Sequence, residues 1–158
     1  MRAFLAAVFA AAASADITDF PKDDAMHADC HVTAVFAGVS CSTIYAEIDA
    51  EIRAWGEDTT SPAGGVYELK EEKVDSYVWS TRLTRDKKYT DDNLFPLEET
   101  DEGCTVAGHS RSIHTSIYDY SVNFCNLWNV YNGIGGFTYT VGDCAYPASD
   151  PVTTCARY

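Results

Sequence analysis

Two neighbouring carboxylates, Asp91 and Asp92, are well suited to bind a cation. Carboxylate oxygens are preferred ligands of Ca²⁺, and the calcium sites of extracellular modules are often weak. No D-x-D-x-D-G loop surrounds the two residues, so solvated turn residues are the competing interpretation. We therefore expect no cofactor beyond a weak possibility of calcium.

Four histidines, His27, His31, His109 and His114, could also bind a metal ion. His27 and His31 are four residues apart, a spacing that would place two ligands on one face of a helix, but nothing nearby indicates a helix. His109 and His114 are separated by an odd number of residues, so on one strand they would point to opposite faces. We expect surface or structural histidines.

Polar side chains recur at regular steps in two later segments. Asparagine disfavours helices, so four asparagines at a three-residue step within a predicted helix need an explanation. They could bind a polar ligand such as a glycan, or donate hydrogen bonds to buried backbone. A small, hydroxylated face of the preceding strand could line a cavity or let a helix approach closely. The candidate ligand-binding residues are Asn123, Asn126, Asn129, Ser110, Ser112 and His114.

No catalytic residue is predicted. The segment 108–112 (Gly-His-Ser-Arg-Ser) lacks the final glycine of the G-x-S-x-G elbow, and its strand pattern continues where the elbow needs a turn into a helix. Any two of the 24 acidic residues could meet in space, but the sequence singles out no pair. We lean against an enzyme.

Six cysteines predict three disulfides, because the number is even and no C-x-x-C zinc pair occurs. Fifteen pairings are possible for six cysteines, and the sequence does not choose among them. If all six pair, no thiol is left to act as a nucleophile. The predicted disulfide residues are Cys30, Cys41, Cys104, Cys125, Cys144 and Cys155.

The N-terminus is typical of a secretory signal peptide. One arginine precedes an apolar run of small residues that ends in an A-x-A site at residues 13–15. We predict a signal peptide over 1–15, an acidic leader over 16–29 and a single disulfide-stabilised domain over 30–158. The expected location is secreted or extracellular, and no later apolar run is long enough to span a membrane.

The charge is strongly acidic, with 24 Asp and Glu against 11 Lys and Arg, a formal net charge of −13. Such a surface repels nucleic acid and anionic membranes and favours cations or a basic partner. A hydrophobic content of 46% argues against disorder.

The periodicity predicts an α+β fold. Isoleucines at steps of four predict a helix over 42–55, and a second helix is expected over 120–131. Residues 31–37 could be a strand or a helix start, and residues 137–141 resemble a short strand. We expect an antiparallel β-sheet packed by the two helices, with an irregular, disulfide-tied C-terminal tail. The predicted strands are 66–71, 77–84, 89–98 and 104–118.

Three short motifs resemble the signature of an uncharacterised domain of bacteria, algae and plastids, over roughly residues 80–127. They are an aromatic-x-Asp-Asp group at 89–92, a Ser-Arg-Ser strand at 110–112 and an Asp-x-x-x-Asn group at 119–123. Ser121 stands where that signature has glycine, and Asn126 where it has arginine. The resemblance implies an α+β fold in which a strand leads into a helix, and it implies no activity.

Three hypotheses about function follow. The first is a non-catalytic secreted binding domain for a glycan, a lipid or a basic protein. The second is a structural subunit of an extracellular coat or fibre, which would self-associate. The third is a carboxylate-based hydrolase, which would need a cleft with two acids of separated pKa.

Overall fold

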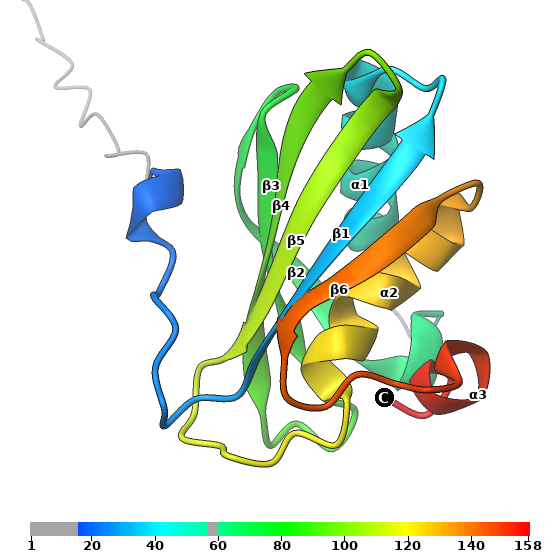
Figure 1. The fold of residues 1–158 in the computed structure, drawn as a ribbon. Helices are drawn as coiled ribbons and strands as arrows, with labels where there is room; N and C mark the ends of the chain where they lie inside the picture. Colours follow the sequence, from blue (N-terminus) through cyan, green and yellow to red (C-terminus); the bar gives the residue numbers. More distant parts are fainter. Residues whose placement is uncertain (1–15, 57–59) are drawn as a thin grey trace, which may run out of the picture.

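A computed structural model describes residues 16–56 and 60–158, so the predicted signal peptide lies outside the described residues. The chain forms a six-stranded antiparallel sheet in the order β2-β3-β4-β5-β1-β6 (Figure 1). Helices α1 and α2 cover one face of this sheet, which confirms the α+β prediction. The strands are β1 (Asp29–Ala37), β2 (Val66–Lys73), β3 (Tyr77–Leu83), β4 (Thr90–Thr100), β5 (Gly103–Ser112) and β6 (Thr138–Cys144).

The first helix, α1 (Cys41–Ala54), buries the apolar stripe that its periodicity predicts, with Ile44, Ile48 and Ile52 almost fully inaccessible. Its N-cap is Ser40, whose hydroxyl accepts a hydrogen bond from the backbone N–H of Thr43. The other helices are α2 (Val122–Ile134), the short α3 (Pro151–Cys155) and two 3-10 turns, η1 (Ile17–Asp19) and η2 (Pro62–Gly64).

The second helix lies very close to the sheet at Gly108 of β5. A Cβ atom on Gly108 would lie 2.1 Å from the hydroxyl oxygen of Tyr131 and 3.1 Å from Leu127. The Tyr131 hydroxyl donates to the carbonyl of Val32 at 3.0 Å. The small residues of β5 therefore allow a helix to approach closely, which was one of the two roles proposed for that face.

The strand β5 ends at Ser112, six residues before the predicted end at 118. Ser112 pairs with Asp91 near the start of β4, and Arg111 pairs with Asp29 at the start of β1. Because both neighbouring strands begin there, β5 has no strand partner beyond this level. Residues 113–121 instead form a loop, in which Ser116 exchanges backbone hydrogen bonds with the leader.

The C-terminal tail is more regular than predicted. Residues 138–144 form β6, which pairs with β1, and residues 151–155 form α3. A strand was expected only over 137–141, because the remainder has no alternating apolar pattern: β6 is mostly exposed and is joined to the sheet through its backbone.

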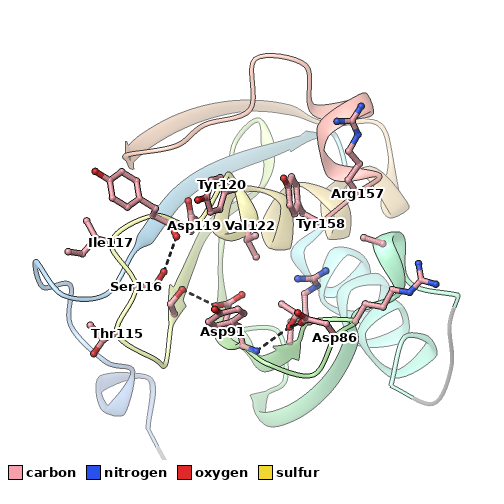
Figure 2. Close-up of a pocket in the computed structure, with 17 residues that line it drawn as sticks. Asp86, Asp91, Thr115, Ser116, Ile117, Asp119, Tyr120, Val122, Arg157 and Tyr158 are labelled. Carbon is pink, nitrogen blue, oxygen red and sulfur yellow. Dashed lines mark hydrogen bonds between the residues drawn. The ribbon is translucent and has the colours of Figure 1, made fainter.

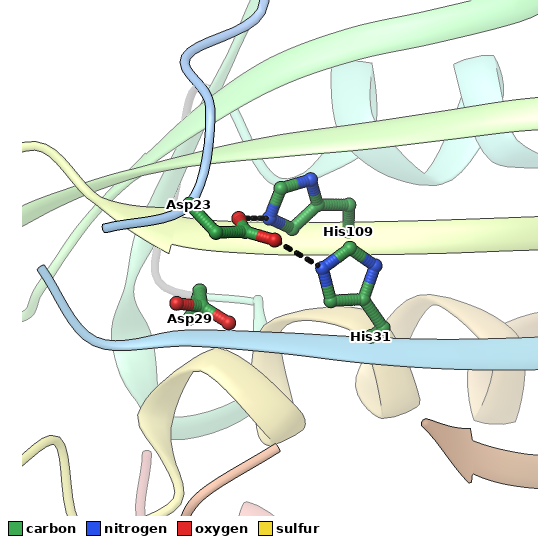
Figure 3. Close-up of side chains that lie close together, drawn as sticks. All are labelled: Asp23, Asp29, His31 and His109. Carbon is green, nitrogen blue, oxygen red and sulfur yellow. Dashed lines mark hydrogen bonds and ion pairs between the residues drawn. The ribbon is translucent and has the colours of Figure 1, made fainter. Parts of the chain in front are cut away.

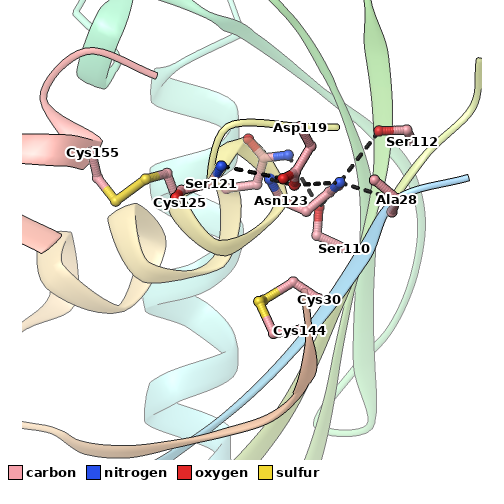
Figure 4. Close-up of a disulfide and its surroundings, with 11 residues drawn as sticks. Ala28, Cys30, Ser110, Ser112, Asp119, Ser121, Asn123, Cys125, Cys144 and Cys155 are labelled. Carbon is pink, nitrogen blue, oxygen red and sulfur yellow. Dashed lines mark hydrogen bonds between the residues drawn. A yellow bond between two sulfur atoms is a disulfide. The ribbon is translucent and has the colours of Figure 1, made fainter. Parts of the chain in front are cut away.

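Three disulfides are formed, as predicted, and they indicate an oxidising environment. They are Cys30–Cys144, Cys41–Cys104 and Cys125–Cys155. The first joins β1 to β6, the second joins α1 to β5, and the third ties α3 to α2 (Figure 4). Within residues 16–56 and 60–158, no helix is both long and apolar enough to cross a membrane.

The acidic leader crosses the face of the sheet that the helices leave open (Figure 1). Phe20 of the leader packs with Trp79, Tyr77 and Leu94 in a small second core. An ion pair of 2.6 Å joins Asp24 to Arg111 of β5. The leader is therefore part of the folded domain.

Candidate functional site

A pocket of about 770 Å³ lies at the end of the sheet where β3 and β5 end and β4 begins (Figure 2). The loop 113–121, the start of α2 and the C-terminal residues Arg157 and Tyr158 complete its walls. This volume is within the range of about 300–1,000 Å³ that is usual for small-molecule sites.

The floor of the pocket is polar and internally bonded. Asp91 accepts hydrogen bonds from the Ser112 hydroxyl at 2.9 Å and from the Asn126 amide at 2.9 Å. Burial raises the pKa of Asp91, although these two hydrogen bonds favour its charged form. Both carboxylate oxygens therefore already have a donor.

Asp119, which also lines the pocket, lies two residues before Ser121, the N-cap residue of α2. Its carboxylate accepts from the backbone N–H groups of Ser121 at 3.2 Å and Asn123 at 3.0 Å. The Asn123 amide donates to Asp119 and to the carbonyl of Ala28 (Figure 4). This network fixes the start of α2 against the sheet.

Three arginines line the pocket: Arg82, Arg85 and Arg157. The described residues contain two further arginines, Arg53 and Arg111, and both form ion pairs with carboxylates. Among the described residues, no carboxylate forms an ion pair with any of the three pocket arginines. Three carboxylates, those of Asp86, Asp91 and Asp119, also line the pocket, so the arginines lie among acidic groups without forming an ion pair with them.

Arg82 is the most unusual of the three, because its side chain is only 2% exposed. Its Nε and Nη1 atoms have no hydrogen-bond partner in the part of the chain that the structure describes. Gly65 makes room for the guanidinium, since a Cβ on Gly65 would lie 2.4 Å from Nε. The ring of Tyr67 lies 6.0 Å from the guanidinium carbon.

The mouth of the pocket is aromatic and apolar. Tyr118 is 67% exposed and Tyr120 is 71% exposed, and Tyr89 and Ile117 are also exposed. Exposed side chains of this size around a cavity provide apolar area that a ligand can cover. The pocket therefore combines a polar interior, which contains Arg82 and Asp91, with an apolar rim to which Arg85 and Arg157 add exposed positive charge.

The disulfide Cys125–Cys155 positions the C-terminal wall of the pocket. The Asn129 amide donates to the carbonyls of Cys155 and Tyr158, each at 3.2 Å. These contacts hold Arg157 and Tyr158 close to the start of α2.

The candidate residues predicted from the sequence lie in and behind this pocket. Of the six ligand-binding candidates, only Ser112 lines it. Asn123, Asn126 and Asn129 are buried and bond to protein groups, so their amides face the interior rather than solvent. Ser110 is also buried, and it hydrogen-bonds to Asn123 and Asn126. His114 is exposed beyond the end of β5 and does not line the pocket.

The two carboxylates proposed as a calcium pair point to opposite faces of the sheet. Asp91 faces α2, whereas Asp92 faces the other side, where it accepts from the Trp79 indole at 2.8 Å and pairs with Lys70 at 3.0 Å. Neighbouring residues of a strand always diverge in this way. Asp91 and Asp92 therefore cannot share one cation, and the sequence interpretation as a pair is corrected.

The sequence analysis did not single out the three arginines or the tyrosines of the rim. Arg82 and Arg85 are close in sequence, but Arg157 is brought to them only by the tail and its disulfide. A count of arginines in an acidic chain could have drawn attention to them, but not to their common location.

All three carboxylates of the pocket are hydrogen-bonded within the protein. Each pocket carboxylate accepts a hydrogen bond from a protein donor: Asp91 from Ser112, Asp119 from Asn123, and Asp86 from Thr84 at 2.8 Å.

Comparisons with family models, with curated proteins and with solved structures found no match for this chain. The resemblance to the uncharacterised domain stays a prediction.

Proposed function

We propose that this protein is a secreted, non-catalytic binding domain whose pocket takes a small amphiphile with an acidic group. The observation that supports this most is the set of three pocket arginines without a carboxylate partner among the described residues. Secretion is supported by the N-terminal sequence pattern and by three disulfides, which are typical of oxidising compartments.

The acidic group of the proposed ligand is inferred from the buried charge of Arg82. A guanidinium stays charged at any physiological pH, and a buried charge without a partner is costly. A carboxylate, sulfonate or phosphate of a ligand in the pocket would lie beside this guanidinium and compensate its charge. Arg85 and Arg157 at the same pocket would add attraction for an anion.

The apolar body of the proposed ligand is inferred from the exposed apolar side chains at the rim of the pocket. Tyr118, Tyr120 and Ile117 are each more than half exposed around the opening. Covering this surface would contribute hydrophobic free energy at about 25 cal/mol per Å². Of the ligands considered from the sequence, a lipid with an acidic head fits the site better than a basic protein, which the arginines would repel.

A matched pair of fluorescent probes tests this function. Anilinonaphthalene sulfonate is an anionic aromatic amphiphile, and N-phenylnaphthylamine is a close neutral analogue without the sulfonate. We expect the folded protein to bind the sulfonate in a saturable manner, at one site per chain. The neutral analogue should bind about tenfold or more weakly, because a charge-assisted hydrogen bond contributes about 1.5–3 kcal/mol.

Paired variants locate the site. Arg85→Gln with Arg157→Gln should weaken binding of the sulfonate, while Lys73→Gln with Lys87→Gln serves as a control. These two lysines are exposed and do not line the pocket. Equal binding of the two probes, or equal effects of the two pairs, would refute an acid-specific pocket.

The other two hypotheses predict different outcomes. A coat or fibre subunit would self-associate in size-exclusion chromatography and would not bind the sulfonate at a defined site. A hydrolase would turn over ester or glycoside substrates, and Asp91→Asn would abolish the turnover. The binding proposal expects a stable monomeric binder without turnover.

A further inference from the structure

Four potential metal ligands meet on the open face of the sheet, opposite the helices and away from the pocket. They are Asp23 of the leader, Asp29 and His31 of β1, and His109 of β5 (Figure 3). Their ligand atoms all lie within 4.8 Å of one another. From this juxtaposition we infer a binding site for a divalent transition-metal ion, with zinc as the best fit.

The sheet brings the two histidines together. His31 and His109 are directly paired in the register of β1 with β5, and their side chains are on the same face. Their rings are stacked, with centroids 3.9 Å apart and planes 20° from parallel. The sequence analysis compared each histidine only with its neighbours in sequence, and so it missed this pair across strands.

Both imidazoles direct Nε2 at the carboxylate of Asp23. The distance is 3.0 Å from His31 and 2.8 Å from His109 (Figure 3). Two ring nitrogens and a carboxylate thus converge on one point, as the ligands of a common cation do.

The charges of the cluster also fit a cation. Two carboxylates, those of Asp23 and Asp29, lie together beside the two imidazoles. A dication would relieve the repulsion between the two carboxylates, and Arg111 is already paired with Asp24.

The donor set selects the class of metal. Two imidazole nitrogens and two carboxylates suit zinc and related transition metals, whereas calcium and magnesium prefer oxygen ligands only. Around zinc, tetrahedral ligand atoms lie about 3.3 Å apart, given bond lengths of about 2.0–2.1 Å. The two contacts with Asp23, at 3.0 and 2.8 Å, are slightly shorter than this value, and all four ligand atoms lie within 4.8 Å of one another.

The consequence for the fold is that the metal would fasten the leader to the sheet. Asp23 is the only one of the four ligands that lies outside a strand. A bound ion would therefore connect residues before β1 with both β1 and β5.

Calorimetric titration of the tag-free protein with zinc tests the site. We expect one zinc per chain, and affinity reduced about tenfold or more by His31→Gln or by Asp29→Asn. His114→Gln is the matched control, because His114 is exposed and outside the cluster, and it should not change the affinity. Cobalt gives a second readout, since a tetrahedral site produces intense visible absorption.

Two further measurements keep the test decisive. Circular dichroism must show that the variants are folded, and zinc should slow amide hydrogen exchange in residues 20–24 only in the wild type and the control. Absence of saturable zinc binding by the wild type, or an equal loss in His114→Gln, would overturn the proposal. Binding of anilinonaphthalene sulfonate should be unchanged in His31→Gln, so this test is independent of the pocket.

Discussion

Arg82 and Asp91 lie directly opposite each other on β3 and β4, yet no ion pair joins them. Both side chains are almost fully buried, at 2% exposed each. Asp91 accepts instead from Ser112 and Asn126, and Arg82 is left with two unsatisfied nitrogen atoms among the described residues. A buried arginine without an ion-pair partner lowers the stability of the free protein. Its presence is explained if a ligand supplies the anionic partner of Arg82.

The first prediction concerns the close approach of α2 to the sheet. Gly108→Ala should lower the free energy of unfolding by about 1–3 kcal/mol, because the new Cβ would overlap the Tyr131 hydroxyl. Chemical denaturation measures this change. The double variant Gly108→Ala, Tyr131→Phe should lose less than the sum of the two single variants, because it removes the overlapping atom. Simple additivity would contradict the proposed contact.

The second prediction concerns the asparagine stripe. Asn126→Ala should lower the free energy of unfolding by about 1–3 kcal/mol, since it leaves the buried Asp91 carboxylate without one of its donors. Asn132→Ala is the control, because Asn132 belongs to the same three-residue step but is exposed. Equal denaturation midpoints for the two variants would show that the internal hydrogen bonds of the stripe are unimportant.

The sequence predicted the α+β class, α1 with its apolar stripe and the strands β2 to β5, because burial on one face leaves a periodic pattern. It predicted only the first part of β6, which is exposed on most of its length and is joined to β1 by backbone pairing and by Cys30–Cys144. The end of β5 depends on where β1 and β4 begin, and this is a tertiary property.

The sites were harder to predict than the fold. The three-residue spacing of Asn123, Asn126 and Asn129 marks a stripe of hydrogen-bonding groups, but spacing alone does not show whether the stripe faces a ligand or the protein interior. The pocket arginines and the cluster around His31 and His109 join residues far apart in the chain. Only strand register and the disulfide to the tail bring them together.

A third prediction concerns alkaline pH. Burial raises the pKa of Tyr67 to about 12, from 10.0 in an exposed tyrosine. The folded state therefore holds this proton more tightly than the unfolded state. The resulting stability is fully present below pH 10 and is lost as the pH rises through about 12, by roughly 2–3 kcal/mol.

Tyr67→Phe tests this assignment. The variant should show a smaller loss of unfolding free energy between neutral pH and pH 12 than the wild type does. Tyr118→Phe, in which the substituted ring is largely exposed, should follow the wild type. A variant Tyr67→Phe with the unchanged alkaline slope would show that another group governs alkaline unfolding.

The fourth prediction separates two disulfides by function. Removing Cys125–Cys155 or Cys41–Cys104 by paired Cys→Ala substitutions should cost roughly 2–4 kcal/mol of stability in each case. Only loss of Cys125–Cys155 should also weaken binding of anilinonaphthalene sulfonate, because it releases the tail that carries Arg157. Fluorescence titration under conditions in which both variants are folded distinguishes the two. Equal weakening by both pairs would count against the tail as a pocket wall.

The most direct test of the central claim is to measure Arg82→Met twice, once for stability and once for binding of anilinonaphthalene sulfonate. Methionine fills a similar volume without a charge, so the free energy of unfolding should be unchanged or higher by up to about 2 kcal/mol. Binding should fall about tenfold or more, because the ligand anion loses its buried partner. A destabilised variant that binds the probe as well as the wild type does would contradict this account, since Arg82 would then serve the fold and not a ligand.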